Sequence, residues 1–396
     1  MQKFLTPADI LLPKKDFNKW SVIACDQYTS EPEYWAETEA NVGDTPSALN
    51  IVLPEVYLSK DNSERIAKIN STMETYLKGD VFDTFENTLV LTVRRLNNGK
   101  TRTGIVGLID LEEYSYEKGA DTLTRATEAT VVERIPPRVE IRKDAPLELP
   151  HVMLLVNDPK RSLIEPLLEN CDSFEKLYDF ELMQNAGAIK GYKIPDSKTD
   201  DINKILAELK EENNGLLFAV GDGNHSLATA KECYKNHGGS RYALVEIVNI
   251  HDNSLEFEPI YRIVFGVKPE RLVNEFVTAM GGECDGENCH KYTCVWGENR
   301  KEISVKANSH LAVADLQKFL DDYIKANSEV EIDYIHGISN TEKLALKPDT
   351  LGFIFDGMGK ADLFPAVSAD GSLPRKTFSM GTADDKRFYL EARKIK

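Results

Sequence analysis

The chain has 396 residues, of which 41% are hydrophobic and 29% are charged, a balance typical of soluble globular proteins and unlike that of disordered or fibrous ones. Its 48 Lys and Arg residues are outnumbered by 65 Asp and Glu residues, giving a formal net charge of −17. This charge argues against a general nucleic-acid binder, because binding a phosphate backbone needs a positive face.

Length and pattern also set expectations about the compartment. The apolar run at the N-terminus is too short for a signal peptide, and no window approaches eighteen apolar residues, so no membrane partner is expected. Four of the six cysteines are isolated or lie in apolar surroundings, which favours reduced thiols in a cytoplasmic protein. The oligomeric state is left open, with a homodimer as one option.

Residues 1–145 predict an N-terminal α/β lobe. WSVIAC (20–25), TLVLTVRRL (88–96) and TGIVGLIDL (103–111) have the composition of strands, and residues 63–79 have the periodicity of an amphipathic helix. The proline-rich stretch IPPRVEIRKDAPLELP, residues 135–150, predicts an extended crossing segment.

Residues 146–267 predict a central α/β lobe, since strand-like runs alternate with helical ones. The strands are expected at 151–158, 177–182, 188–194 and 241–250, and the helices around 162–171 and 201–212. Residues 268–396 alternate again and are expected to pack back on the other two lobes. The expected fold is therefore α/β (mixed α+β), with two or three lobes and mixed sheets.

The segment ECDGENCHKYTC, residues 283–294, places three cysteines and a histidine close together. The spacing C-x4-C-H-x3-C fits no common zinc knuckle. The segment predicts a hairpin with a turn at residues 285–288 instead, and no residue is assigned as a metal ligand.

The stretch LLFAVGDGNHSLATAKECY, residues 216–234, carries the densest polar turn in the chain. An apolar strand at 216–220 runs into a turn with Gly221 and Gly223, and a helix is expected to begin within two residues of Ser226. Unpaired backbone N–H groups at a helix start form a ready anion site. The alternative is structural: Asn224 or Ser226 caps the helix, Asp222 ties the turn and His225 fills a gap.

The motif AVGDGNHSLATA resembles the DGHHR-type motif of a bacterial and archaeal family catalogued as domain of unknown function 1015. WSVIACDQYTSEPEYW, RATEATVVERIPPR and LPRKTFSMGTADDKRFYLEARKI resemble other segments of that family, so the resemblance covers nearly the whole chain. The family's turn is similar to that of the ParB and sulfiredoxin superfamily, which includes a free-serine kinase that uses ADP. The resemblance implies a ParB/sulfiredoxin-like element around residues 221–226 that binds nucleotide phosphates.

The sequence departs from the family motif at two positions. Asn224 stands where the family often has a first histidine, and Ser226 stands where it has arginine. Loss of that arginine removes a bidentate phosphate donor. Sulfiredoxin chemistry also needs a cysteine at the turn, and none lies between Cys171 and Cys233, so a sulfinic-acid reductase is not expected.

Three further segments supply candidate site residues. A polar run holds Arg125, Glu128, Thr130 and Arg138, whose arginines can clamp phosphate while the glutamate serves as a general base. Surface ion pairs explain this run equally simply, and only the resemblance favours Arg125 and Glu128.

Asp26 follows the strand SVIAC and can hold a divalent cation or a substrate amine, or cap the helix that begins near Pro32. In the C-terminal segment, Arg375 and Lys376 can supply phosphate-binding charge; only the resemblance separates them from ordinary surface residues.

These residues predict a nucleotide-dependent phosphotransferase for a small hydroxyl-bearing metabolite, with ATP or ADP and Mg²⁺ as hypothetical cofactors. The alternatives are a non-catalytic nucleotide-binding regulator or partner-binding protein and, ranked last, a ParB-like DNA-associated protein. Arg125, Glu128, Asp222, Asn224 and His225 are expected to line one pocket. The expected catalytic residues are Glu128, Asp222 and His225, and the expected binding residues are Gly221, Gly223, Asn224, Ser226, Arg125, Thr130, Arg138, Asp26, Arg375 and Lys376.

Overall fold

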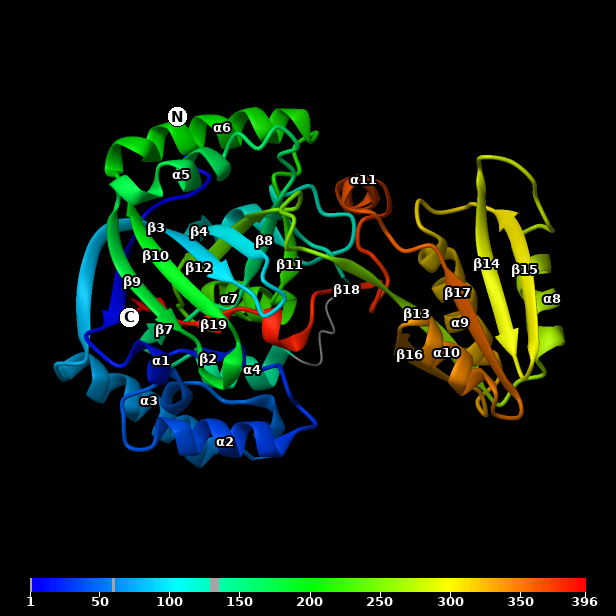
Figure 1. Cartoon of the computed structure of the whole chain (residues 1–396), viewed down its shortest axis with the longest axis horizontal. Coiled ribbons are helices and arrows are strands. Elements are labelled where there is room, and N and C mark those ends of the chain that lie inside the picture. Colours follow the sequence, from blue (N-terminus) through cyan, green and yellow to red (C-terminus); the bar gives the residue numbers. More distant parts are fainter. Residues whose placement is uncertain (1, 59–60, 129–134) are drawn as a thin grey trace. The chain divides into compact units, whose positions relative to one another are not determined.

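The computed structural model describes residues 2–58, 61–128 and 135–396 (Figure 1). Its contacts divide the chain into two compact units. Unit 1 holds Met1–Ala126, Thr130–Leu255 and Gly381–Lys396, and unit 2 holds Thr127–Ala129 and Glu256–Met380. The fold is of the mixed α/β class that the sequence predicts.

A mixed sheet forms the centre of unit 1, with ten strands among the described residues in the order β5-β6-β11-β8-β12-β4-β3-β10-β9 and β1 paired beside β3. β11 runs parallel to β6, and β12 runs parallel to β8, whereas β3 and β4 are antiparallel. The strands are β1 (Ala8–Pro13), β3 (Phe82–Arg95), β4 (Thr101–Asp110), β5 (Tyr114–Ser115), β6 (Thr124–Ala126), β8 (Met153–Val156), β9 (Glu175–Glu181), β10 (Ala188–Ile194), β11 (Phe218–Asp222) and β12 (Tyr242–Asn249).

The sheet separates two hydrophobic cores, because successive side chains of a strand point to opposite faces. In β3, Val90 packs in one core while Leu89 and Leu91 pack in the other. The first core contains Trp20 and Trp35, and the second contains residues from β8, β11 and β12.

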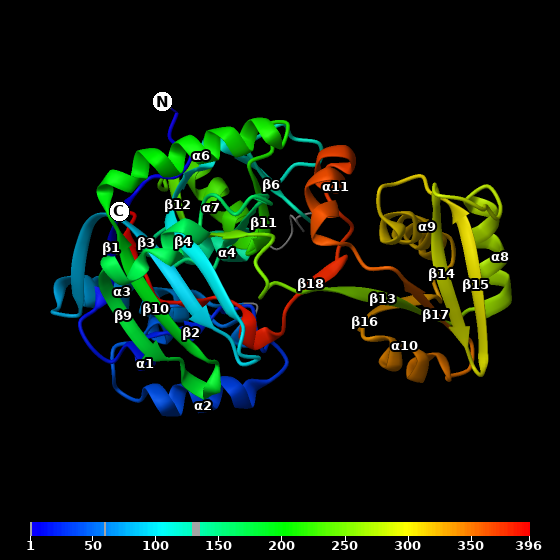
Figure 2. The same cartoon turned by 45° about the horizontal axis from the view of Figure 1, so that its top comes forward.

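Helices cover both faces of this sheet. Figure 1 shows α5 and α6 on one side of it and α1, α2 and α3 on the other, while α4 and α7 lie side by side (Figure 2). No helix in the described part of the chain is both long and apolar enough to cross a membrane. The helices of unit 1 are α1 (Phe17–Trp20), α2 (Pro32–Val42), α3 (Ser63–Lys78), α4 (Ile135–Arg142), α5 (Glu165–Glu169), α6 (Thr199–Glu212) and α7 (Asn224–Asn236).

The C-terminal segment returns to unit 1 through two short strand pairs. β19 (Phe388–Tyr389) pairs with β2 (Val22–Ile23), and β20 (Arg393–Lys394) pairs with β7 (Leu147–Glu148). These pairings bring residues 381–396 against the loop that follows β2.

Unit 2 is built on a second sheet, with strand order β15-β14-β17-β13-β16 and β18 paired to β13. The strands of this sheet pair antiparallel. Its elements are β13 (Phe257–Phe265), α8 (Pro269–Ala279), β14 (Cys289–Trp296), β15 (Asn299–Lys306), α9 (Ala312–Ala326), β16 (Glu331–His336), α10 (Ile338–Ala345), β17 (Thr350–Phe355), α11 (Leu363–Asp370) and β18 (Phe378–Met380).

These units differ from the three lobes expected at 1–145, 146–267 and 268–396. The first two expected lobes share one sheet, since β12 pairs with β4 and β10 pairs with β3. The last residues of the third belong to unit 1. Periodicity locates strands but does not show which distant strands pair.

The expectation of an extended segment at residues 135–150 is wrong for its first half, which forms α4 (Ile135–Arg142). Pro136 and Pro137 occupy the first turn of this helix, where a missing N–H has no intrahelical acceptor to lose. The two prolines mark a helix start rather than an extended segment.

The cysteine-rich segment contains a disulfide between Cys284 and Cys289, whereas Cys25, Cys171, Cys233 and Cys294 are free. The hairpin lies further along than expected, between β14 and β15, and residues 285–288 form the loop that the disulfide closes.

Candidate functional site

The junction of β11 and α7 carries most of the predicted site residues. β11 ends at Asp222, Gly223 adopts a left-handed conformation, and α7 begins at Asn224. The first hydrogen bond of the helix joins the N–H of Leu227 to the carbonyl of Gly223 at 3.0 Å. The expected strand, turn and helix are confirmed: the strand lies two residues later than predicted, and the helix starts within the predicted distance of Ser226.

A side chain at either glycine of this junction would lie too close to neighbouring atoms. A Cβ on Gly221 would lie 2.8 Å from Cγ of Leu155. Gly223 has a φ of 84°, and a Cβ there would lie 3.0 Å from Cα of Val152 and 3.4 Å from Cδ2 of His151. The glycines therefore let the helix start lie close against β8 and His151.

The capping role considered for Asn224 or Ser226 is absent. Gly223 is the N-cap residue, and no side chain caps α7. Oδ1 of Asn224 and Oδ2 of Asp222 are buried and accept no hydrogen bond within the described part of the chain. Buried acceptors of this kind are rare in folded proteins and call for an explanation.

Lys386 is a candidate site residue that the sequence does not single out. Its Nζ lies 3.8 Å from Oδ2 of Asp222, and the two side chains are 15% and 16% exposed. The charge of Lys386 also helps to lower the pKa of Asp26. The positive charge of Lys386 thus lies close to two of the predicted site carboxylates, Asp222 and Asp26.

Two buried arginines hold the loop that carries Lys386. Arg94 donates hydrogen bonds to the carbonyls of Lys386 and Asp384, and Arg102 donates to the carbonyl of Asp385 at 2.5 Å. Both arginines lie in the strands of the large sheet, β3 and β4. The position of Lys386 is therefore fixed from the centre of unit 1.

Asp26 faces a second missed residue, His151, whose Nε2 lies 3.9 Å from Oδ2 of Asp26. Nδ1 of the same ring lies 2.9 Å from the hydroxyl of Tyr389, which accepts a hydrogen bond from the backbone N–H of Cys25. Burial, with Cys25 and Asp26 nearby, keeps the pKa of Tyr389 well above its ordinary value, so the hydroxyl stays protonated and links His151 to the backbone of Cys25.

The electrostatics around Asp26 favour a carboxylate rather than a thiolate. Burial raises the pKa of Asp26, but His151, the amide of Gln27 and Lys386 outweigh it, so the pKa is lowered overall. Burial and the charge of Asp26 raise the pKa of Cys25 to about 12. Cys25 is therefore a thiol at neutral pH and no activated nucleophile.

The structure brings Asp26 together with residues 222–226 through His151 and Lys386. Arg138 lies near the same loop, where it forms an ion pair with Glu55, whose backbone N–H donates to the carbonyl of Cys25 at 2.8 Å. Arg125 pairs in register with Ala219 of β11, and its guanidinium donates to the carbonyl of Thr122 and to Asp121. Both arginines are thus engaged by neighbouring groups of the protein.

The remaining predicted residues belong to unit 2 or fall outside the described chain. Glu128 forms an isolated parallel β-bridge with Leu373. Its negative charge favours the protonated form of the buried Arg262. Arg262 donates to the backbone carbonyls of Arg375 and Lys376. Glu128, Arg375 and Lys376 are therefore neighbours around one buried arginine. Thr130 lies outside the described residues.

Around residues 222–226 the protein offers both donors and acceptors. Lys386 and the first-turn amides of α7 suit the oxygens of a phosphate. Asp26, Asp222 and Oδ1 of Asn224 suit a hydroxyl, an ammonium group or Mg²⁺, which usually takes one or two carboxylates together with substrate phosphates. No cluster of three or more His, Cys, Asp or Glu side chains able to hold a metal occurs in the described ranges.

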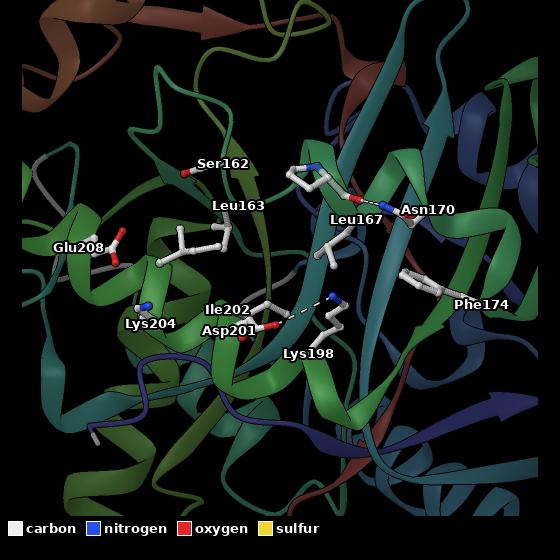
Figure 3. A pocket seen from close by; sticks show the side chains of 12 residues that line it. Ser162, Leu163, Leu167, Asn170, Phe174, Lys198, Asp201, Ile202, Lys204 and Glu208 are labelled. Atoms are coloured by element: carbon white, nitrogen blue, oxygen red, sulfur yellow. Dashed lines mark hydrogen bonds and ion pairs between the residues drawn. The ribbon is translucent and has the colours of Figure 1, made fainter.

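A separate hollow of about 410 Å³ lies in unit 1 between α5 and α6 (Figure 3). Its wall is apolar at Leu163, Leu167 and Ile202, and Lys198 and Asp201 lie 3.9 Å apart at its edge. None of the predicted site residues lines it.

One family model covers most of the chain. The family model described as protein of unknown function (DUF1015) matches residues 5–323, and no curated protein matches the chain. Among solved structures, a conserved hypothetical protein from Pyrococcus furiosus aligns with a TM-score of 0.38 at 14% identity, over 72% of this chain and 94% of that one.

A free serine kinase variant in complex with ADP aligns with a TM-score of 0.40 at 11% identity, over 72% of this chain and 91% of that one. SbnI with a C-terminal truncation, from Staphylococcus aureus, aligns with a TM-score of 0.35 at 11% identity, over 72% and 82%. These likenesses are distant, and no function is carried over from them.

Proposed function

We propose that this chain, which belongs to the DUF1015 family of proteins of unknown function, is a nucleotide-dependent phosphotransferase that acts on a small hydroxyl-bearing metabolite. The observation that carries the proposal is the group at the start of α7. There Lys386 lies 3.8 Å from Asp222, while Oδ2 of Asp222 and Oδ1 of Asn224 are buried and accept no hydrogen bond from described residues.

The phosphate-binding half of the proposed site consists of Lys386 and the backbone amides of residues 224–226. These amides precede the first intrahelical hydrogen bond of α7, a helix of 13 residues, so they lie at the positive end of the helix dipole. His225 adds a further donor when its ring is protonated. Phosphoryl transfer depends mainly on such positioning and charge neutralisation.

The acceptor half consists of Asp222, Asn224 and Asp26. In the proposed step the metabolite hydroxyl oxygen bonds to the terminal phosphorus of the nucleotide, and the bond from that phosphorus to the leaving phosphate oxygen breaks. The hydroxyl proton passes to Oδ2 of Asp222. Asp26, oriented by His151, holds the substrate. Mg²⁺ bound with the nucleotide would supply further charge neutralisation, and the oxygens of Asp222 and Asn224 are of the kind that hold it.

Phosphorus NMR tests this function directly. The protein is incubated with ATP or ADP, with and without Mg²⁺, and with a panel of hydroxyl-bearing amino acids, polyols and sugars; the expected result is a new phosphomonoester signal. Asp222→Asn should abolish the product and keep nucleotide binding, whereas Glu128→Gln tests the other predicted base. If the Asp222→Asn variant still forms the product, Asp222 is not the base that accepts the hydroxyl proton.

A non-catalytic nucleotide-binding regulator is the second candidate, favoured by Ser226 at the position of the family's arginine. Ser226→Arg would add a charge-assisted phosphate donor, and we expect it to tighten nucleotide binding by about tenfold or more. Nucleotide binding without any phosphomonoester, in the wild type and in this variant, would favour the regulator over the enzyme.

A further inference from the structure

We infer that Tyr28, stacked on Tyr34, forms a platform for the nucleobase of the nucleotide; this inference rests on the proposed function. Tyr28 follows Asp26 by two residues, and its ring is half-buried. The Tyr28 and Tyr34 rings are nearly parallel, with centroids 3.8 Å apart and an interplanar angle of 12°.

The ring pair rests on the core through Trp35. Trp35 is fully buried and meets Tyr34 edge-on, with centroids 5.6 Å apart. Its Nε1 donates to the carbonyl of Gln27 at 3.3 Å, which ties the loop carrying Tyr28 to the core. The ring contacts therefore run from the buried Trp35 through Tyr34 to Tyr28, and both tyrosines are half-buried.

The backbone of Tyr28 is strained. Its φ is 52°, a left-handed conformation that is an outlier for a bulky aromatic residue and that costs of order 1–3 kcal/mol. Packing two rings together does not require this conformation. Such strain concentrates at ligand-binding positions, because the surrounding structure there holds a side chain where the ligand needs it.

The platform is fixed to the loop that carries the phosphate-binding lysine. The hydroxyl of Tyr28 donates a hydrogen bond to Oδ1 of Asp384, two residues before Lys386, and Arg94 holds the carbonyls of both Asp384 and Lys386. Two residues of chain span at most about 7 Å. The Tyr28 side chain and Lys386 are thus held at neighbouring positions of one loop, which is the arrangement that the base and the phosphates of one nucleotide require.

The ligand chemistry follows from the ring pair. Stacking on tyrosine suits any planar heterocycle, and base–aromatic stacking contributes about 1–3 kcal/mol per base. The platform is therefore expected to add affinity for nucleotides over pyrophosphate, with little choice among bases.

Calorimetry with ADP and with inorganic pyrophosphate tests the platform. Tyr28→Asn removes the ring but tolerates the left-handed backbone, and we expect it to weaken ADP binding by about tenfold and to leave pyrophosphate binding unchanged. Tyr28→Phe keeps the ring and should retain the preference for ADP. Etheno-ADP gives a readout that needs no variant, since its fluorescence should be quenched on binding to wild type.

The outcomes separate the platform from the phosphotransferase. If Tyr28→Asn weakens ADP and pyrophosphate equally or changes neither, or if bound etheno-ADP is not quenched, the platform is wrong while the phosphate site stands. If wild type binds neither ADP nor pyrophosphate at millimolar concentration, the proposed function fails and the platform fails with it.

Discussion

Unit 1 contains two groups of charged side chains that are alike in composition and unlike in geometry. In the first, Arg387 donates hydrogen bonds to Glu246, Glu391 and the carbonyl of Pro150, while Thr92 and Tyr178 donate to the remaining carboxylate oxygens. Its three charged residues are at most 3% exposed. In the second, Lys386 lies 3.8 Å from Asp222, and His151 lies 3.9 Å from Asp26.

The difference lies in hydrogen-bond satisfaction. Every carboxylate oxygen of the Arg387 group has a donor, and a buried network of this kind rigidifies the fold. In the Lys386 group, the charged atoms are too far apart for hydrogen bonds, and buried oxygens of Asp222 and Asn224 accept none from described residues. The first group is complete without a ligand, whereas the second leaves buried acceptors open, as the proposed site requires.

The largest expected effect comes from breaking the complete network. Arg387→Met leaves Glu246 and Glu391 buried without their cation, and we expect the free energy of unfolding in urea to fall by about 3–5 kcal/mol. Arg95→Met is the matched control, because Arg95 pairs with Glu181 at the surface, with 56% of its side chain exposed; its loss should cost about 1 kcal/mol or less. Equal losses would refute the distinction.

A second effect follows from pH. Burial raises the pKa of Glu148, but Arg142, Arg393 and the N–H of Leu244 outweigh it and hold the pKa at about 2, below its ordinary value of 4.5. This stabilisation, on the order of 3 kcal/mol, is present above pH 4.5 and is lost as the pH falls toward 2. Urea unfolding should show Glu148→Gln less stable than wild type at pH 6, with the gap closing between pH 4.5 and 2. A gap independent of pH would contradict the ion-pair explanation.

A third effect concerns the start of α7. Gly223→Ala meets both a positive φ and Cα of Val152 at 3.0 Å, whereas Gly215→Ala has a φ of 88° and nothing within 4 Å. We expect a loss of about 1 kcal/mol for Gly215→Ala from backbone strain alone, and about 2 kcal/mol for Gly223→Ala, measured by thermal unfolding. Equal losses would show that the contact between residue 223 and Val152 does not destabilise the Gly223→Ala variant.

These comparisons also show what the sequence could predict. The apolar run before Gly221 and the helical spacing after Ser226 are local signals, and they predicted the strand, the turn and the helix. Lys386 and His151 have no local signal, because a lysine in ADDKR and a histidine before an apolar strand resemble ordinary surface and strand-edge residues. Their positions depend on the pairing of β19 with β2 and on the hydrogen bonds from Arg94 to the carbonyls of Asp384 and Lys386. Only the folded chain supplies these contacts.

Arg375 and Lys376 illustrate the same limit. The resemblance points to the C-terminal segment, and within it to the basic pair next to Pro374 rather than to Lys386. In the structure Arg375 lies over the ring of Tyr334 and 3.7 Å from Asp321, whereas Lys386 approaches Asp222. Basic residues ten positions apart cannot be ranked by charge alone.

The most direct test of the account is to measure stability and binding together for Lys386→Met, with Lys376→Met as the control from the same segment. We expect Lys386→Met to lower the free energy of unfolding by less than Arg387→Met does, because Lys386 lies 3.8 Å from Asp222 and makes no hydrogen bond to it, and to weaken binding of ADP and pyrophosphate by at least about tenfold in calorimetry. Lys376→Met should leave both quantities near wild type. A Lys386→Met protein that loses 3–5 kcal/mol of stability and binds ADP and pyrophosphate as wild type does would show that the Lys386 group is structural, and would contradict the account.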